Sequence, residues 1–206
     1  VHTSKWIGAT RDGLELRDPI GSAIANGVLY TADNGSREVR TFDLLTGAPL
    51  ASVSIPGEGF INGIAGTDDG TSYLSDTPQG IIYEISPDGD VSVFAEGAPL
   101  NSPNGVAMDN DGNIVVVNIG DSAVITYSPS GQVVKQEAAV EGGNDGVVGP
   151  CRNASTNSET TAAKVLIVAS KSETGASTAR LHAPAATGTR ASTLNAVPSW
   201  RVMLRS

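Results

Sequence analysis

The stretch PNGVAMDNDGNIVVVN, residues 103–118, holds an Asn-Gly and an Asp-Gly pair seven residues apart. Two related stretches precede it, PIGSAIANGVLYTAD at 19–33 and INGIAGTDDGTSYLSD at 61–76. The leading glycines of these stretches recur every 42 residues, at Gly21, Gly63 and Gly105. A fourth start, NDGVV, places Gly146 after a further 41 residues. A fixed period of this length predicts a repeat architecture.

Each repeat contains four short strand-like segments. In the second repeat these are GIAG, TSYLSD, GIIYEIS and DVSVFAE, separated by turn sequences such as TDDGT and SPDGD. The third repeat has the same order of segments. A four-stranded unit of about 40–45 residues is typical of a β-propeller blade. The sequence therefore predicts an all-β propeller, of which residues 1–148 supply about three and a half blades.

Composition narrows the function classes. The net charge is −9, which argues against nucleic acid as a partner. No apolar run approaches the roughly 20 residues of a membrane helix, and no signal peptide is recognisable. The single cysteine, Cys151, excludes an internal disulfide framework. We therefore expect no membrane partner and a cytoplasmic location.

The Asn before the leading glycine is the candidate functional position. The second glycine of the 103–118 stretch, Gly112, already provides the turn between the first two strands. The innermost strands of a propeller line its axial channel, so equivalent positions of successive blades converge there. Asn62, Asn104 and Asp145 share one phase and should form a ring of oxygens, which suits hard cations. The alternative is that they only cap strand ends.

Other recurring positions have a structural interpretation. The glycine after each ring residue is expected to let the backbone pass close to a ligand. Asp33 and Asp76 recur 43 residues apart at strand ends, where we expect hydrogen bonds to neighbouring turns rather than catalysis. Tyr30 and Tyr73 recur with the same spacing and are interpreted as packing residues.

The repeat pattern stops after Val148. Of the 58 residues from 149 to 206, 27 are Ala, Ser or Thr, and their net charge is +5 against −14 for residues 1–148. Only KVLIVAS, 164–170, has a clear strand pattern. Residues 149–206 are interpreted either as a disordered or partner-binding tail, or as sequence unrelated to the repeats after a reading-frame interruption, which we favour. The incomplete ring predicts exposed blade faces and self-association.

Residues 6–148 resemble the senescence marker protein/gluconolactonase/luciferin-regenerating-enzyme family. The resemblance lies in FINGIAGTDDGTSYLSDT, LNSPNGVAMDNDGNIVVVN and GGNDGVV. It implies a six-bladed propeller with a divalent metal in its channel, Ca²⁺ in the first place and Zn²⁺ or Mg²⁺ as alternatives. It also implies hydrolysis of lactones or sugar-acid esters.

The resemblance also assigns roles to residues. Asn104 resembles the metal-binding Asn of the family, and Asp145 resembles a metal-binding Asp that acts as the general base. Asn62 resembles the Asn that contacts substrate or metal. The family's first-blade Glu has no counterpart, because LELRDPIG places Arg17 or Asp18 there. Asp18 is the available replacement as a metal ligand.

The implied mechanism is metal-assisted hydrolysis, in which the cation polarises the lactone carbonyl and Asp145 takes the proton of the attacking water. Two alternatives stay open at this point. One is a non-catalytic propeller of the NHL type that binds a ligand or a protein. The other is an inactive fragment. The sequence therefore leaves open whether the protein is an enzyme.

Overall fold

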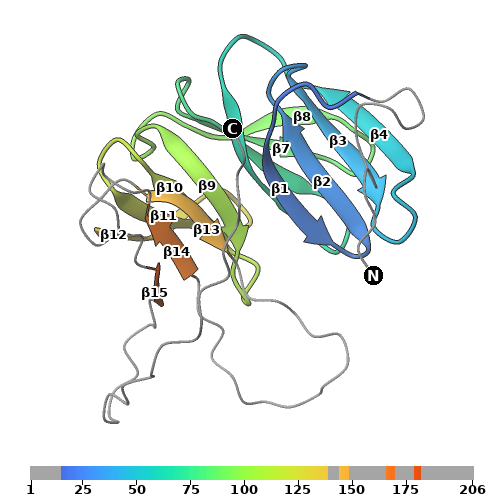
Figure 1. Ribbon diagram of the computed structural model, residues 1–206. Coiled ribbons are helices and arrows are strands. Elements are labelled where there is room, and N and C mark those ends of the chain that lie inside the picture. Colours follow the sequence, from blue (N-terminus) through green and yellow to red (C-terminus); the bar gives the residue numbers. More distant parts are fainter. Residues whose placement is uncertain (1–14, 139–143, 149–165, 170–178, 182–206) are drawn as a thin grey trace, which may run out of the picture.

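The computed structural model describes residues 15–138, 144–148, 166–169 and 179–181 (Figure 1). All regular structure in these ranges is β-strand, arranged in antiparallel sheets of sequential strands. Blade 1 comprises β1 (Pro19–Ala25), β2 (Val28–Asp33), β3 (Glu38–Asp43) and β4 (Pro49–Ser54). Blade 2 comprises β5 (Ile61–Gly66), β6 (Ser72–Asp76), β7 (Ile81–Ile85) and β8 (Val91–Glu96). Blade 3 comprises β9 (Pro103–Met108), β10 (Ile114–Asn118), β11 (Ala123–Tyr127) and β12 (Val133–Ala138).

This arrangement confirms the all-β prediction of four-stranded blades. The predicted hairpin turns are present as well. Ala25 pairs with Val28, so Asn26 and Gly27 form a two-residue turn, with φ of 43° and 75°. Positive φ at both turn residues matches the twist of the flanking strands, which explains the Asn-Gly pair here. Among the described residues, no helix is long and apolar enough to span a membrane.

The core lies between neighbouring blades. Blades 1 and 2 enclose one apolar cluster, which includes Tyr30 and Leu74, and blades 2 and 3 enclose another, which includes Tyr73 and Val116. The ring of Tyr73 packs edge-on against Phe94, with ring centroids 4.9 Å apart. The two recurring tyrosines are therefore packing residues, as predicted. The apolar side chains of each sheet thus pack against the neighbouring sheet, as is usual for repeat architectures.

The inner strands lie against one another. β1 contacts β5, β5 contacts β9, and β9 contacts β13 (Asn144–Val148). A side chain at Gly21 would collide with the carbonyl oxygen of Asn62, and one at Gly63 would collide with that of Asn104. A methyl group on Gly105 would lie 2.9 Å from the Cα atom of Gly146.

The repeated glycines thus have a different role from the one we expected. They allow the backbones of adjacent inner strands to approach each other, so ligand approach is not needed to explain them. Glycine recurs at this phase because four backbones converge on one axis and leave no room for a Cβ atom.

The chain beyond residue 148 also contributes strands. β13, β14 (Leu166–Ala169) and β15 (Ala179–Leu181) form a three-stranded antiparallel sheet in that order, beside blade 3 (Figure 1). β14 coincides with the predicted strand KVLIVAS. The division at residue 148 into propeller and tail stays a prediction, since most of 149–206 lies outside the described residues.

Candidate functional site: the rim of the inner strands

The predicted ring positions lie at the start of successive inner strands. Asn62 is the second residue of β5, Asn104 the second of β9 and Asp145 the second of β13. Because the glycines that follow them touch across the strands, these three backbones stand at one level of the shared axis. The corresponding residue of β1 is Ile20, which is 42% exposed. The side chain of Asp145 lies outside the described residues.

Asn104 is held by the neighbouring blade. Its residue is buried, with 5% exposure. The hydroxyl of Ser75, itself fully buried, donates to the carbonyl oxygen of Asn104 at 2.6 Å and accepts from the backbone N–H of Gly63 at 2.9 Å. One hydroxyl on β6 therefore ties β5 to β9, and its bond to the Asn104 carbonyl satisfies a buried pair of polar groups.

The orientation of the Asn62 amide is fixed through Thr77. The Thr77 hydroxyl donates to the carbonyl oxygen of Pro103 at 2.8 Å, which uses its only proton. It must then accept from Asn62, whose Nδ2 atom lies 3.4 Å away. The amide oxygen of Asn62, the atom that could bind a cation, consequently points away from Thr77.

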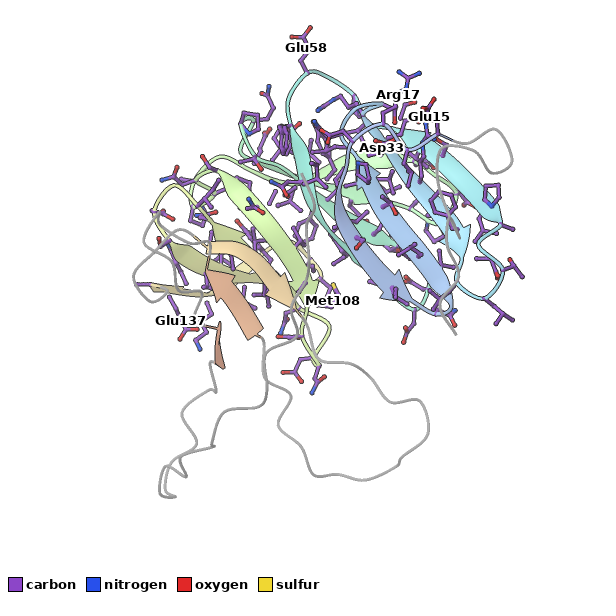
Figure 2. All side chains as sticks on the ribbon, viewed as in Figure 1. Glu15, Arg17, Asp33, Glu58, Met108 and Glu137 are labelled. Atoms are coloured by element: carbon purple, nitrogen blue, oxygen red, sulfur yellow. The ribbon has the colours of Figure 1, made fainter. Side chains whose placement is uncertain are left out.

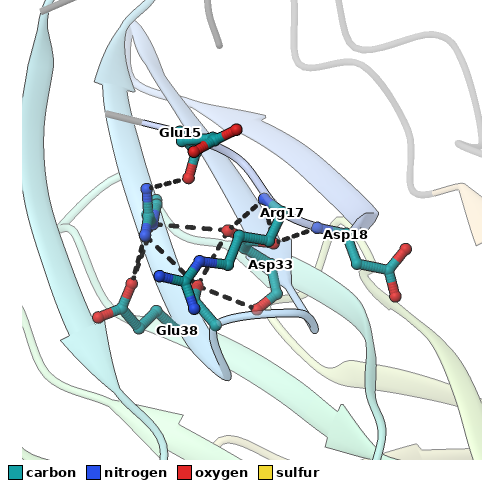
Figure 3. A network of polar contacts seen from close by, with 7 residues as sticks. Glu15, Arg17, Asp18, Asp33 and Glu38 are labelled. Carbon is teal, nitrogen blue, oxygen red and sulfur yellow. Dashed lines mark hydrogen bonds and ion pairs between the residues drawn. The ribbon is translucent and has the colours of Figure 1, made fainter. Parts of the chain in front are cut away.

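Blade 1 is linked to this rim through Asn34. The Asn34 side chain accepts from the backbone N–H of Ile61 at 3.2 Å and donates to the carboxylate of Asp18 at 3.2 Å. Asn34 and Thr77 are equivalent, since each follows the recurring strand-end Asp and each bonds to the first residue of the next inner strand. Asp18 is exposed, and its carboxylate points away from the Asp33 network (Figure 3).

Asp33 anchors the segment that leads into β1. Its fully buried carboxylate accepts from the backbone N–H groups of Arg17 and Asp18 at 3.1 and 2.7 Å and from the Ser36 hydroxyl at 2.9 Å (Figure 3). Arg40 lies 3.6 Å away. Burial opposes ionisation, but these donors outweigh it and hold the pKa of Asp33 below its usual value. This is the strand-end role that we predicted.

Asp76 has the same role one blade later, and here the partner crosses between blades. Arg37 of blade 1 donates to Asp76 at 2.7 Å and to the carbonyl oxygen of Pro56 at 2.8 Å. The backbone N–H of Phe60 also donates to Asp76, at 3.1 Å. In blade 3 the position is Asn118, whose amide donates to the carbonyl oxygen of Pro99 at 2.9 Å.

The sequence did not reveal the linking side chains Asn34, Ser75, Thr77 and Arg37. A signal existed for two of them, because Asn34 and Thr77 each follow the recurring aspartate by one residue. No signal existed for Ser75 or Arg37. Their partners are backbone carbonyls or a carboxylate on a different blade, and a one-dimensional period does not show which blades face each other.

The rim fits a hard cation in the type of its donor atoms. Among the described residues, no group of three or more His, Cys, Asp and Glu side chains could hold a metal ion. Of the predicted ligand and substrate residues whose side chains are described, Asn62 and Asn104 carry amide oxygens and Asp18 carries a carboxylate. Such a set suits Ca²⁺ or Mg²⁺ better than Zn²⁺, which prefers nitrogen and sulfur.

The opposite ends of the inner strands border an open cavity of about 950 Å³, here called the axial groove. Its lining comes from residues 22–26 of blade 1, 64–69 of blade 2 and 106–109 of blade 3, with contributions from Leu29, Thr71, Tyr73, Gly112, Pro129 and Val147. Neither Asn62 nor Asn104 lines it. The rim and the axial groove are thus separate features at the two ends of one axis.

The fold is similar to that of known propeller structures. Virginiamycin B lyase from Staphylococcus aureus matches with a TM-score of 0.58 and 14% identity over 85% of this chain and 61% of that chain. Hydrazine synthase from Kuenenia stuttgartiensis matches with a TM-score of 0.61 and 14% identity over 86% of this chain and 49% of that chain. A chain of a nidogen/laminin complex matches with a TM-score of 0.56 and 20% identity over 73% of this chain and 56% of that chain. The chain therefore spans between 49% and 61% of these structures.

Comparison with curated protein sequences gives no match. The family model described as the SMP-30/gluconolactonase/LRE-like region matches residues 6–140, which is more than half of the chain. That range contains all three four-stranded blades and two of the ring residues, Asn62 and Asn104. The protein belongs to the SMP-30/gluconolactonase/LRE-like family.

Proposed function

We propose that the rim is the active site of a metal-dependent hydrolase of lactones or related sugar-acid esters. The observation that supports this most is the contact between inner strands at Gly63, Gly105 and Gly146. It brings the backbones of Asn62, Asn104 and Asp145 to one level of the axis. The family has lactonases among its members and often binds divalent metals.

Each residue has a distinct task in this proposal. Asn104 and Asp145 would hold the cation, Ca²⁺ before Mg²⁺ or Zn²⁺, with Asp18 as a further carboxylate from blade 1. A bound cation supplies polarisation of the lactone carbonyl. Asn62, whose amide oxygen is turned away from Thr77, orients the substrate. Asp145 accepts the proton of the attacking water, for which its carboxylate must be ionised.

The test is calcium binding followed by hydrolysis. Thermal unfolding is measured with and without Ca²⁺ for the wild type, Asp145→Asn and Asp111→Asn, the last being an exposed turn aspartate of blade 3. At 100 times the dissociation constant, a bound ligand stabilises by about 2.7 kcal/mol. We expect this stabilisation, together with hydrolysis of δ-gluconolactone in a pH-stat, for the wild type and Asp111→Asn only. Equal Ca²⁺ responses in all three proteins would refute the metal assignment.

A non-catalytic binding propeller is the second candidate, and one observation favours it. Ile20 occupies the ring position of blade 1, so the described part of the ring has an apolar side chain where the other blades have Asn. A protein that binds its ligand without hydrolysis would show Ca²⁺-independent stability and no turnover of any lactone.

A further inference from the structure

The axial groove has an apolar floor. Its exposed or half-buried apolar lining residues are Ala23, Ile24 and Leu29 of blade 1 and Met108 of blade 3. Ile64 and Val106 also line it, but each is only 4% exposed. Met108 lies at the lower end of β9, on the side of blade 1 (Figure 2). The volume of about 950 Å³ is at the upper end of the range of about 300–1,000 Å³ that organic ligands occupy.

The titratable residues that line the groove are acidic. They are Asp68, Asp69 and Asp109, and none of the described lining residues is Lys, Arg or His. Asp69 is held ionised, because the Thr67 hydroxyl and the backbone N–H of Thr71 lower its pKa. The negative charge of Asp69 also acts on Tyr73, another residue that lines the groove. Burial first, and then the charges of Glu84 and Asp69, raise the pKa of Tyr73 to about 12.

The turn that carries Asp68 and Asp69 is held in place by a contact between blades. Asn26 in the β1–β2 turn donates its amide to the carbonyl oxygen of Asp68 at 3.0 Å. The turns of blades 1 and 2 are thereby joined next to the groove. The carboxylate of Asp109 is likewise fixed, since it accepts from the backbone N–H groups of Asp111 and Asn113, both at 2.8 Å.

We propose that the axial groove binds an organic cation, an ammonium group carried on an apolar body. The apolar body would displace water from the floor, which is the favourable step. The ammonium group would lie among the carboxylates of Asp68, Asp69 and Asp109, where charge complementarity selects it over neutral and anionic ligands. The site is independent of the proposed hydrolase site, because it lies at the other end of the inner strands.

The experiment uses octyltrimethylammonium as the probe and octyl sulfate as its anionic counterpart, both below their micelle concentrations, in calorimetric titrations of the full chain. We expect octyltrimethylammonium to bind at least about tenfold more tightly than octyl sulfate, and its affinity to fall between low and high salt. Equal affinity of the two probes, or no binding of the cation, would overturn the proposal.

Two pairs of variants locate the site. The double variant Asp68→Asn/Asp69→Asn removes two charges from the lining of the axial groove. The double variant Asp88→Asn/Asp90→Asn removes two charges from the exposed β7–β8 turn. The first pair should weaken cation binding about five- to tenfold, and the second pair less than about twofold. Met108→Lys should abolish cation binding, since it places a like charge on the apolar wall. Equal effects of the two pairs, or unchanged binding by Met108→Lys, would contradict a site in the axial groove.

Discussion

Gly63 offers the sharpest test of how the inner strands meet. Its φ lies outside the left-handed region, so the backbone conformation itself would accept alanine. The neighbouring backbone, however, leaves no room for an alanine Cβ atom. An added Cβ atom would collide with the carbonyl oxygen of Asn104 and lie 2.8 Å from the nitrogen of Val106 and 2.9 Å from the Cα atom of Gly105. All three atoms belong to the backbone of β9, which cannot move without opening the interface between blades 2 and 3.

Overpacking in a well-packed core costs about 1–3 kcal/mol, and occasionally more where backbone must move. We therefore expect Gly63→Ala to lower the free energy of unfolding by about 3 kcal/mol. Gly112→Ala is the matched control. Its φ is +81° and nothing lies within 4 Å of the added atom, so only backbone strain of about 1–2 kcal/mol applies.

The measurement is urea-induced unfolding followed by far-ultraviolet circular dichroism. Gly63→Ala should be the less stable of the two variants, and its response to Ca²⁺ should weaken because Asn104 moves with β9. If Gly63→Ala unfolds at the same urea concentration as the wild type, the inner strands do not approach as closely as described, and the common level of the rim residues is wrong.

Four further outcomes are expected. Thr77→Val removes the hydroxyl that links β5 to β9 and should cost about 1 kcal/mol in urea unfolding, while Thr77→Ser should restore most of it. Arg37→Met leaves the buried carboxylate of Asp76 without its cation and should cost about 3 kcal/mol, which a loss of only a few tenths would contradict. Because the folded-state pKa of Asp33 is lowered, its carboxylate stabilises the protein above about pH 4 and this contribution is lost as the pH falls through the folded pKa; Asp33→Asn should flatten the acid side of the Tm profile. Val133 and Val134, 46% and 56% exposed on β12, should promote self-association, so Val134→Lys should shift light-scattering masses toward the monomer; unchanged masses would contradict association through this strand.

Much of the fold follows from the repeat. The 42-residue period gave the blade boundaries, and the strand segments GIAG and TSYLSD correspond to parts of β5 and β6. The turns TDDGT and SPDGD and the packing role of Tyr30 also followed from local pattern. These features depend on residues near each other in sequence, whose turn preference and apolar alternation carry the information.

The role of the glycines and the linking hydroxyls did not follow. Gly63 was expected to make room for a ligand, and it instead makes room for β9. No sequence pattern marks Ser75, although its hydroxyl joins two inner strands. In both cases the deciding partner is a backbone atom on another blade, which carries no mark in the sequence.

The sequence by itself determined that the chain forms four-stranded units of constant length, and that Asn62, Asn104 and Asp145 occupy one phase of them. Only the tertiary structure decided at what level these positions meet, which end of the axis carries the axial groove, and which blade supplies each hydrogen bond at the rim. The physical reason is that a sequence period fixes positions along the chain. Steric contact between the converging backbones fixes the level of each position along the propeller axis.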